Sequence, residues 1–201
     1  MIEKVKEFNR VFEVVEVIDS KQIDLRVKLM DSELQEYKEA SEINKSSFAT
    51  ASSHFEHVLT EQFDSCLDQL YVVLGVAILH RVDVNLKKMI RGVMPCNRKD
   101  YTIIQNKELY DDISTSIALY DANAIDNNTS DIERCLGAII IDILTLSCYH
   151  GFADKLVDGF NEVHRSNMTK LHDGKIVKNN DGKVMKPDTF EEPKLKQILW
   201  T

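Results

Sequence analysis

The sequence predicts an all-α protein. The whole chain contains only 7 Gly and 3 Pro, the residues that most often interrupt helices. Apolar residues recur every three or four positions over long stretches, which is the period of an amphipathic helix. With 201 residues, of which 43% are hydrophobic, the chain can bury a core, and we expect one domain over residues 1–201.

Two helices are expected ahead of a polar loop at residues 41–53. The first covers residues 2–16, where one face carries Val5, Phe8, Val11 and Phe12. After a connector, the second covers the run LRVKLMDSELQEYKEA, residues 25–40. At about 100° per residue, Glu33 falls inside the apolar arc of this helix and Glu36 lies at its edge. A carboxylate that faces a core requires a cation, because an uncompensated buried charge is unstable.

The third helix, over residues 54–82, is apolar on all sides from Leu70 onward. That pattern is typical of a buried central helix. On one side of it, Glu61, Asp64 and Asp68 fall within about 60° of one another. Two helices therefore both carry carboxylates on a side that turns toward the core.

The middle of the chain, residues 84–129, is interpreted as an insertion that contains one helix at 107–122. It also holds a basic patch formed by Lys87, Lys88, Arg91, Arg98 and Lys99. Ser130 and Glu133 form a capping box, which predicts the start of another apolar helix. A further helix is expected over residues 153–168.

The C-terminal tail, residues 172–201, differs in character from the rest. Basic segments at 175–178 and 183–186 flank the turn sequence NNDG. This pattern predicts a small β-hairpin. Pro187 and Pro193 then predict an extended end.

Charge and cysteine usage narrow the functional classes. A net charge of -8 and a pI of about 5.3 argue against nucleic acid or an anionic membrane as a partner. No signal peptide and no uncharged run of about 20 residues is apparent. No CxxC pair occurs among Cys66, Cys96, Cys135 and Cys148. We therefore expect a cytoplasmic protein with reduced thiols.

The carboxylates of the second and third helices form an acidic cluster, defined as Glu33, Glu36, Glu61, Asp64 and Asp68. Such a cluster is unstable alone, because each carboxylate raises the pKa of its neighbours. A hard cation relieves the repulsion, and an all-oxygen set favours Mg²⁺, with Mn²⁺ as an alternative. Magnesium takes substrate phosphates as further ligands, which points to phosphate chemistry. The competing interpretation is a solvated or salt-bridged set of surface acids.

An ordered set of segments resembles the all-α nucleoside triphosphate pyrophosphohydrolase superfamily, which includes MazG, phosphoribosyl-ATP pyrophosphohydrolase and the dimeric dUTPases. The segments are FNRVF, LRVKLMDSELQEYKEA, EQFDSCLDQLYVVLGVAI, NEVHRSNMTK, DGKVMKP and EPKLKQIL. They cover about residues 6–83 and 150–200, and the MazG-like branch of bacteria and phages matches best. The family signature is ExxE followed by ExxD.

The resemblance implies a MazG-like bundle that converts a (d)NTP to (d)NMP and pyrophosphate. Glu33, Glu36, Glu61 and Asp64 match the signature acids that hold Mg²⁺, and Asp68 matches a further acid, as ligand or base. Substrate contacts are implied for Asn167, Lys170, Lys183 and Lys186. Relatives form dimers or tetramers, so a homodimer or homotetramer is expected, in the host cytoplasm if the gene belongs to a phage.

The chain departs from this family in two places. Ser32 replaces an acid that usually precedes Glu33, and residues 84–129 have no usual counterpart. Asp142, in IIIDILTL, is a hypothetical replacement acid. Two alternatives stay open: a phosphoribosyl-ATP pyrophosphohydrolase, and a non-catalytic helical interaction protein. The preferred base is not predicted, although Phe8 and Phe12 are candidates for stacking.

Overall fold

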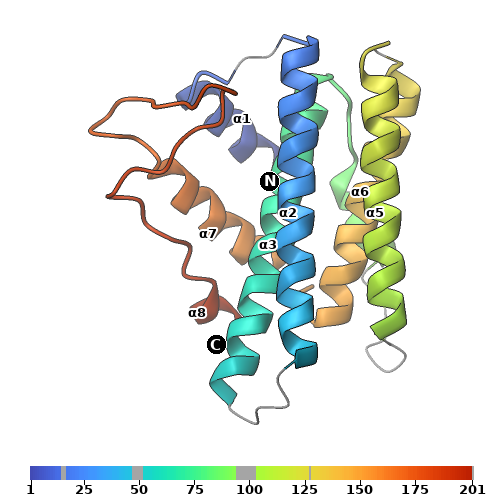
Figure 1. The fold of residues 1–201 in the computed structure, drawn as a ribbon, viewed down its shortest axis with the longest axis vertical. Helices are drawn as coiled ribbons and strands as arrows, with labels where there is room; N and C mark the ends of the chain where they lie inside the picture. Colours follow the sequence, from blue (N-terminus) through green and yellow to red (C-terminus); the bar gives the residue numbers. More distant parts are fainter. Residues whose placement is uncertain (15–16, 47–51, 94–102, 127, 201) are drawn as a thin grey trace.

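The protein is a helical bundle with smaller helices on one side (Figure 1). The structure is a computed structural model that describes residues 1–14, 17–46, 52–93, 103–126 and 128–200. The helices found in these ranges are α1 (Ile2–Val11), α2 (Ser20–Ser46), α3 (Ser52–Leu79), α4 (Leu86–Val93), α5 (Ile103–Ala124), α6 (Thr129–His150), α7 (Leu156–Met168) and α8 (Leu195–Leu199). The predicted all-α class is confirmed.

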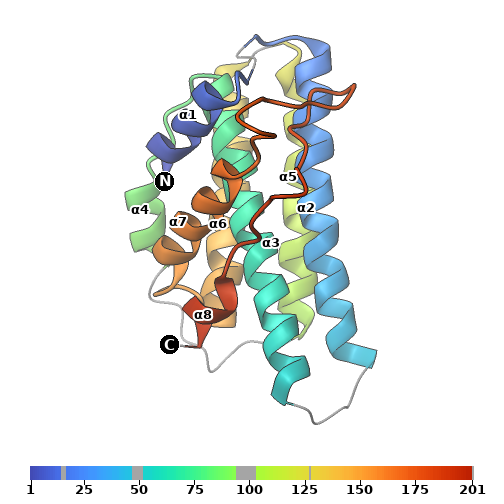
Figure 2. The ribbon, with the colours of Figure 1, turned by 90° about the vertical axis from the view of Figure 1, so that its left-hand side faces the viewer.

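Four long helices, α2, α3, α5 and α6, run side by side (Figures 1 and 2). Helix α3 contacts both α2 and α6, and α5 closes the bundle against α2 and α6. Leu70, Leu74, Ile139 and Tyr120 are fully buried between them. The stretch Phe55–Leu79 of α3 is long and apolar enough to cross a membrane, but 78% of its most apolar window is buried inside the protein. This is also the pattern of a central core helix.

Helices α2 and α3 are antiparallel, and three observations fix their register. Near one end, the Gln62 side-chain amide of α3 donates a hydrogen bond of 3.2 Å to Ser41 Oγ of α2. Near the other, a Cβ at Gly75 would lie 3.7 Å from Arg26 Nη1. Between these points, Glu33 of α2 lies level with Asp68 of α3, and the charge of Asp68 raises the pKa of Glu33. The acids of both helices are therefore at one height.

Helices α1 and α7 cover the remaining side of α3, and α8 packs against α3 and α7. A C-terminal strap, defined as residues 169–194, connects α7 to α8 and crosses over α2 and α3 (Figure 2). The turn of this strap reaches the start of α2, because a Cβ at Gly182 would lie 3.7 Å from Leu25 Cδ2. The turn therefore lies nearer the start of α2 than the acids do, while the rest of the strap passes the acids, because Lys170, Lys186 and Glu192 act on the pKa of Asp68.

The middle of the chain takes part in the bundle. Residues 84–129 contain α4 and α5, and α5 forms one wall of the bundle. Helix α5 (Ile103–Ala124) is longer than the helix predicted at 107–122. Of the basic patch, only the side chain of Lys88 lies within the described part of the chain, where it is exposed.

Several helix boundaries differ from the sequence prediction; among them, α3 ends at Leu79 instead of residue 82, and α7 begins at Leu156 instead of residue 153. Helix α1 ends at Val11 instead of residue 16, and Glu13 then adopts a positive φ of 48°. Helix α2 begins at Ser20, because the Asp19 carboxylate accepts a hydrogen bond of 2.8 Å from the Gln22 amide. It continues to Ser46, so the first part of the predicted loop 41–53 is helical, and residues 47–51 lie outside the described residues.

The predicted β-hairpin is not supported. Among the described residues no strand is formed: segments 175–178 and 183–186 share the isolated bridge Lys178↔Val184, and Lys175 forms a second isolated bridge with His172. The turn itself is present, since Asn179 Oδ1 accepts hydrogen bonds from the amides of Asp181 and Lys183. An isolated two-stranded ribbon is only marginally stable. The segment here packs on the helices beneath it instead of forming a ribbon.

Candidate active site

A pocket of about 170 Å³ lies between α1, α2, α3, the end of α7 and the C-terminal strap. Glu33 and Asp68 line one part of it, together with Lys170, Lys183 and Asn167. The opposite end is lined by Arg26 and Gly75 among others. The cavity thus has one end lined by carboxylates and lysines and another end lined by Arg26.

Glu33 is the most deeply buried acid of the acidic cluster, with 9% of its surface exposed. Burial raises its pKa to about 8, and the charges of Asp68 and Glu36 add to this effect. The ammonium group of Lys183 acts in the opposite direction. The predicted position of Glu33 on the buried face of α2 is confirmed.

Asp64 and Asp68 lie on α3, one turn apart, and both are half-buried. Burial, with repulsion from Asp68 and Glu61, raises the pKa of Asp64 to about 8. Its Oδ1 is sealed from solvent without a hydrogen-bond partner. The pKa of Asp68 is raised to about 6, mainly by burial, while Lys170 lowers it.

Glu36 and Glu61 differ from the other three acids because both are exposed. The Glu61 carboxylate lies 3.5 Å from His57 Nδ1, on the surface of α3. Both residues still act on the buried acids, since Glu36 raises the pKa of Asp68 and Glu61 raises that of Asp64. The five acids therefore form one electrostatic group with a buried centre and an exposed rim.

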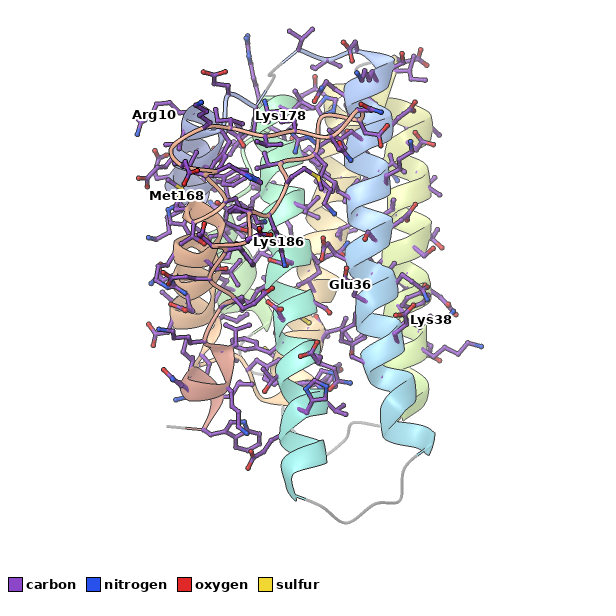
Figure 3. The ribbon with its side chains drawn as sticks, turned by 60° about the vertical axis from the view of Figure 1, so that its left-hand side comes forward. Arg10, Glu36, Lys38, Met168, Lys178 and Lys186 are labelled. Atoms are coloured by element: carbon purple, nitrogen blue, oxygen red, sulfur yellow. The ribbon has the colours of Figure 1, made fainter. Side chains whose placement is uncertain are left out.

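The cations implied by the resemblance gather at this group. Lys170 lines the pocket, and the charge of Asp68 opposes the lowering of its pKa by burial. Lys186 lies where the strap crosses α3, with Glu36 on the neighbouring helix α2 (Figure 3). Its ammonium lies 3.2 Å from Glu192, a strap acid that also raises the pKa of Asp68. The sequence analysis did not single out Glu192, which carries no motif.

The fourth implied substrate contact, Asn167, is 8% exposed and hydrogen-bonds the hydroxyl of Tyr71. Tyr71 Oη also lies 3.0 Å from His164 Nδ1, and the other ring nitrogen of His164 lies 3.3 Å from Glu7 Oε2. Asn167 is thus held by a polar network beside the pocket wall.

The residues fit a hard divalent cation by chemistry. The carboxylates of α2 and α3 are oxygen ligands that crowd one another, and Asp64 Oδ1 lacks a partner. Mg²⁺ prefers such ligands. In the residues that the structure describes, no three His, Cys, Asp or Glu side chains stand at ligand spacing. Rearrangement of exposed Glu36 or Glu61 would therefore accompany metal binding.

One further acid that the sequence singled out lies apart from the cluster. Asp142 is half-buried on α6, and its pKa of about 6 reflects burial and the charge of Asp112 on α5. None of the five acids acts on it, so the structure does not bring this hypothetical replacement acid to the site.

The two predicted stacking residues differ in position. Phe12 is fully buried beneath Phe8, and of the two only Phe8 lines the pocket.

Arg26 and Gly75 at the other end were missed as site residues. A signal was present in the sequence, because each lies seven residues, two helical turns, from an acid of the cluster: Arg26 before Glu33, and Gly75 after Asp68. Seven-residue spacing keeps side chains on one face.

Comparison with known proteins gives one relative without an assigned activity. The chain is 30% identical over 128 residues to the uncharacterized protein L479 of Acanthamoeba polyphaga mimivirus. The match covers 57% of this chain and 50% of the relative, so the chain spans about half the length of the curated relative it matches. No family model matches the sequence. No solved structure matches it either.

Proposed function

We propose that the protein is a Mg²⁺-dependent nucleoside triphosphate pyrophosphohydrolase with a MazG-like bundle, which releases pyrophosphate and a (d)NMP. One observation carries the proposal: acids from two antiparallel helices crowd into one buried group at the wall of a pocket that lysines also line. Buried like charges are retained at a cost to stability, which favours a functional use. The sequence resemblance assigns the same acids.

The residues have separable roles in this proposal. Glu33, Glu36, Glu61 and Asp64 would hold the metal, which would supply positive charge to the phosphates and a more acidic water. Lys170 and Lys183 neutralise phosphate oxygens at the pocket wall, and Asn167 donates to them. Asp68, with a pKa of about 6, is mostly ionised at neutral pH and accepts a proton from the attacking water. Lys186 closes the site from the strap.

A panel of dNTPs and NTPs with Mg²⁺ tests the activity, with pyrophosphate and orthophosphate measured separately. We expect pyrophosphate, because cleavage between the α and β phosphates defines the reaction. Asp68→Asn should lower kcat by at least about 100-fold, since it removes the proposed general base. Asp142→Asn is the matched control: it removes another half-buried acid with a raised pKa and should leave turnover unchanged.

Three results would contradict the proposal. Orthophosphate as the product would indicate cleavage at the terminal phosphate. A strong preference for phosphoribosyl-ATP over all (d)NTPs would assign the related histidine-pathway chemistry. Absence of turnover, together with no change in thermal stability on adding Mg²⁺, would favour a non-catalytic interaction protein whose acids serve only solubility.

A further inference from the structure

The pocket end opposite the acids holds a buried arginine whose charge the described residues do not neutralise. Arg26 is 8% exposed, and its Nε is sealed from solvent without a hydrogen-bond partner. Burial lowers its pKa, and the group that favours its charge is the hydroxyl of Tyr120, not a carboxylate. A buried guanidinium without acceptors is costly. Acceptor atoms of a ligand in the pocket are therefore the expected partners.

The surroundings of Arg26 suit a flat ring. Gly75 allows Arg26 to pack close to the α3 backbone, since an added Cβ would make van der Waals contact with Arg26 Nη1 at 3.7 Å and with Val5 Cγ1 at 3.8 Å. Phe8 lines the same pocket, stacked on Phe12 at 4.4 Å between ring centroids. Aromatic side chains stack on any nucleobase, so stacking contributes affinity. The choice between bases then depends on the polar groups of the pocket.

The length of the pocket matches a nucleotide. Arg26 precedes Glu33 by two turns of α2, and Gly75 follows Asp68 by two turns of α3, which is a separation of about 10 Å along each helix. A nucleotide with its α-phosphate at the acids would extend its sugar past Tyr71 and place its base beside Arg26.

We propose that Arg26 recognises the base and that the base is guanine, an inference that rests on the proposed function for the placement of the phosphates. The fork of an arginine donates two parallel hydrogen bonds, and guanine presents O6 and N7 as adjacent acceptors. Adenine presents a donor beside N7, and thymine presents a methyl group beside O4. Buried Asn9, on the same pocket wall, has an amide that suits the other polar edge of guanine.

Binding without turnover tests the inference. Dissociation constants of dGMP, dAMP, dCMP and dTMP are measured by calorimetry in EDTA. We expect dGMP to bind about 10- to 100-fold more tightly than the others. Arg26→Lys keeps the charge but loses the fork, and should reduce this preference to about threefold or less. Arg134→Lys, on the exposed face of α6, is the matched control and should preserve it.

A second variant keeps the test valid if Arg26→Lys does not fold. Gly75→Ala retains Arg26 and meets it at an ordinary contact distance, so the fold should persist while the added methyl group restricts the position of the guanidinium. We expect it to weaken dGMP binding at least about fivefold, with an unchanged affinity for tripolyphosphate. Far-UV circular dichroism confirms folding of each variant.

Several outcomes would overturn the inference. Tighter binding of dCMP, equal binding of all four nucleotides, or a loss of tripolyphosphate binding in Arg26→Lys would show that Arg26 does not select guanine. These results are distinct from failure of the proposed function. Pyrophosphate release without base preference would remove only the guanine assignment, and a dGMP preference without any turnover would remove only the hydrolase.

Discussion

Glu33 and Asp64 combine burial with close carboxylate neighbours, and both effects raise their pKa values to about 8. In the unfolded chain the same groups return toward 4.5 and 3.8. Between these values the folded protein binds more protons than the unfolded chain, so stability falls as pH rises. His150 acts in the opposite direction but at lower pH, because burial lowers its pKa from 6.5 to about 4.

The window from pH 6.5 to 8 lies above the pKa values of His150 and Asp68, and within it the Met1 amino group, whose pKa burial lowers, opposes the effect of the two carboxylates. In EDTA, we expect the Tm to fall as pH rises through this window, and Glu33→Gln to make the fall shallower because one of the two protons is no longer linked to folding. Thermal denaturation followed by circular dichroism at several pH values measures the change of Tm with pH. Asp111→Asn, which replaces an exposed acid of α5 outside the cluster, is the control. An equal pH dependence in wild type and Glu33→Gln would contradict the assignment.

Mg²⁺ should act on the same residues in a pH-dependent way. A metal binds carboxylates only after they lose their protons, so a given Mg²⁺ concentration should raise the Tm more at pH 8 than at pH 6. Scanning calorimetry with and without Mg²⁺ measures the difference. A Tm increase of the same size in the double variant Glu33→Gln, Asp64→Asn would mean that the metal binds elsewhere.

At the scale of single elements, the C-terminal strap is attached to α7 by a group of hydrogen bonds. Arg165 Nη1 donates to Glu191 Oε2 at 2.6 Å, and Ser166 Oγ donates to the Glu191 carbonyl at 2.7 Å. The Lys194 amide donates to Glu162 Oε1 at 2.9 Å. These contacts hold the end of the segment that carries Lys183 and Lys186 over the acids.

Arg165→Ala should loosen the strap without unfolding the bundle. Exposed ion pairs contribute at most about 1 kcal/mol to global stability, whereas Arg165 joins the strap to α7 through both the Glu191 carboxylate and the Glu192 carbonyl. Hydrogen exchange should therefore accelerate in residues 169–194 and remain unchanged in α3. Arg134→Ala, which breaks an ion pair on α6, is the control. Equal exchange in both variants would show that the strap is held by other contacts.

Helices α3 and α7 pack tightly at Gly159. A Cβ there would clash with Phe63 Cζ and lie 2.7 Å from Leu67 Cδ1. Gly159→Ala should cost about 1–3 kcal/mol, because both neighbours are buried and cannot move freely. Urea denaturation measures the loss. In α4, Gly92 has nothing within 4 Å, so Gly92→Ala should be neutral or slightly stabilising, and equal effects of the two changes would contradict the close packing.

The whole molecule places its site on one side of the bundle. The pocket lies where α1, α2, α3 and the strap meet, while α5 and α6 complete the core behind it (Figure 2). Assembly into a homodimer or homotetramer stays a prediction from the resemblance. Light scattering should give two or four times the chain mass of 23.1 kDa. A mass of one chain at micromolar concentration would contradict it.

Much of the fold was accessible from local patterns. Helical periodicity located every long helix, and Glu33 was placed correctly on a buried face because its neighbours at helical spacing are apolar. The hairpin was predicted wrongly because turn chemistry at Asn179–Gly182 defines a turn but supplies no partner strand. The role of α5 was also hidden, since its sequence does not state which helices it packs against.

The sequence by itself determined where the long helices lie and which carboxylates share a helix face, because both depend on spacing along one chain. The tertiary structure decided which faces meet. It set Glu33 level with Asp68, moved Glu61 to the exposed rim, separated Asp142 from the cluster and left Arg26 in the pocket without a carboxylate. These outcomes depend on the register between α2 and α3 and on the path of the strap, which arise from packing between residues far apart in the chain.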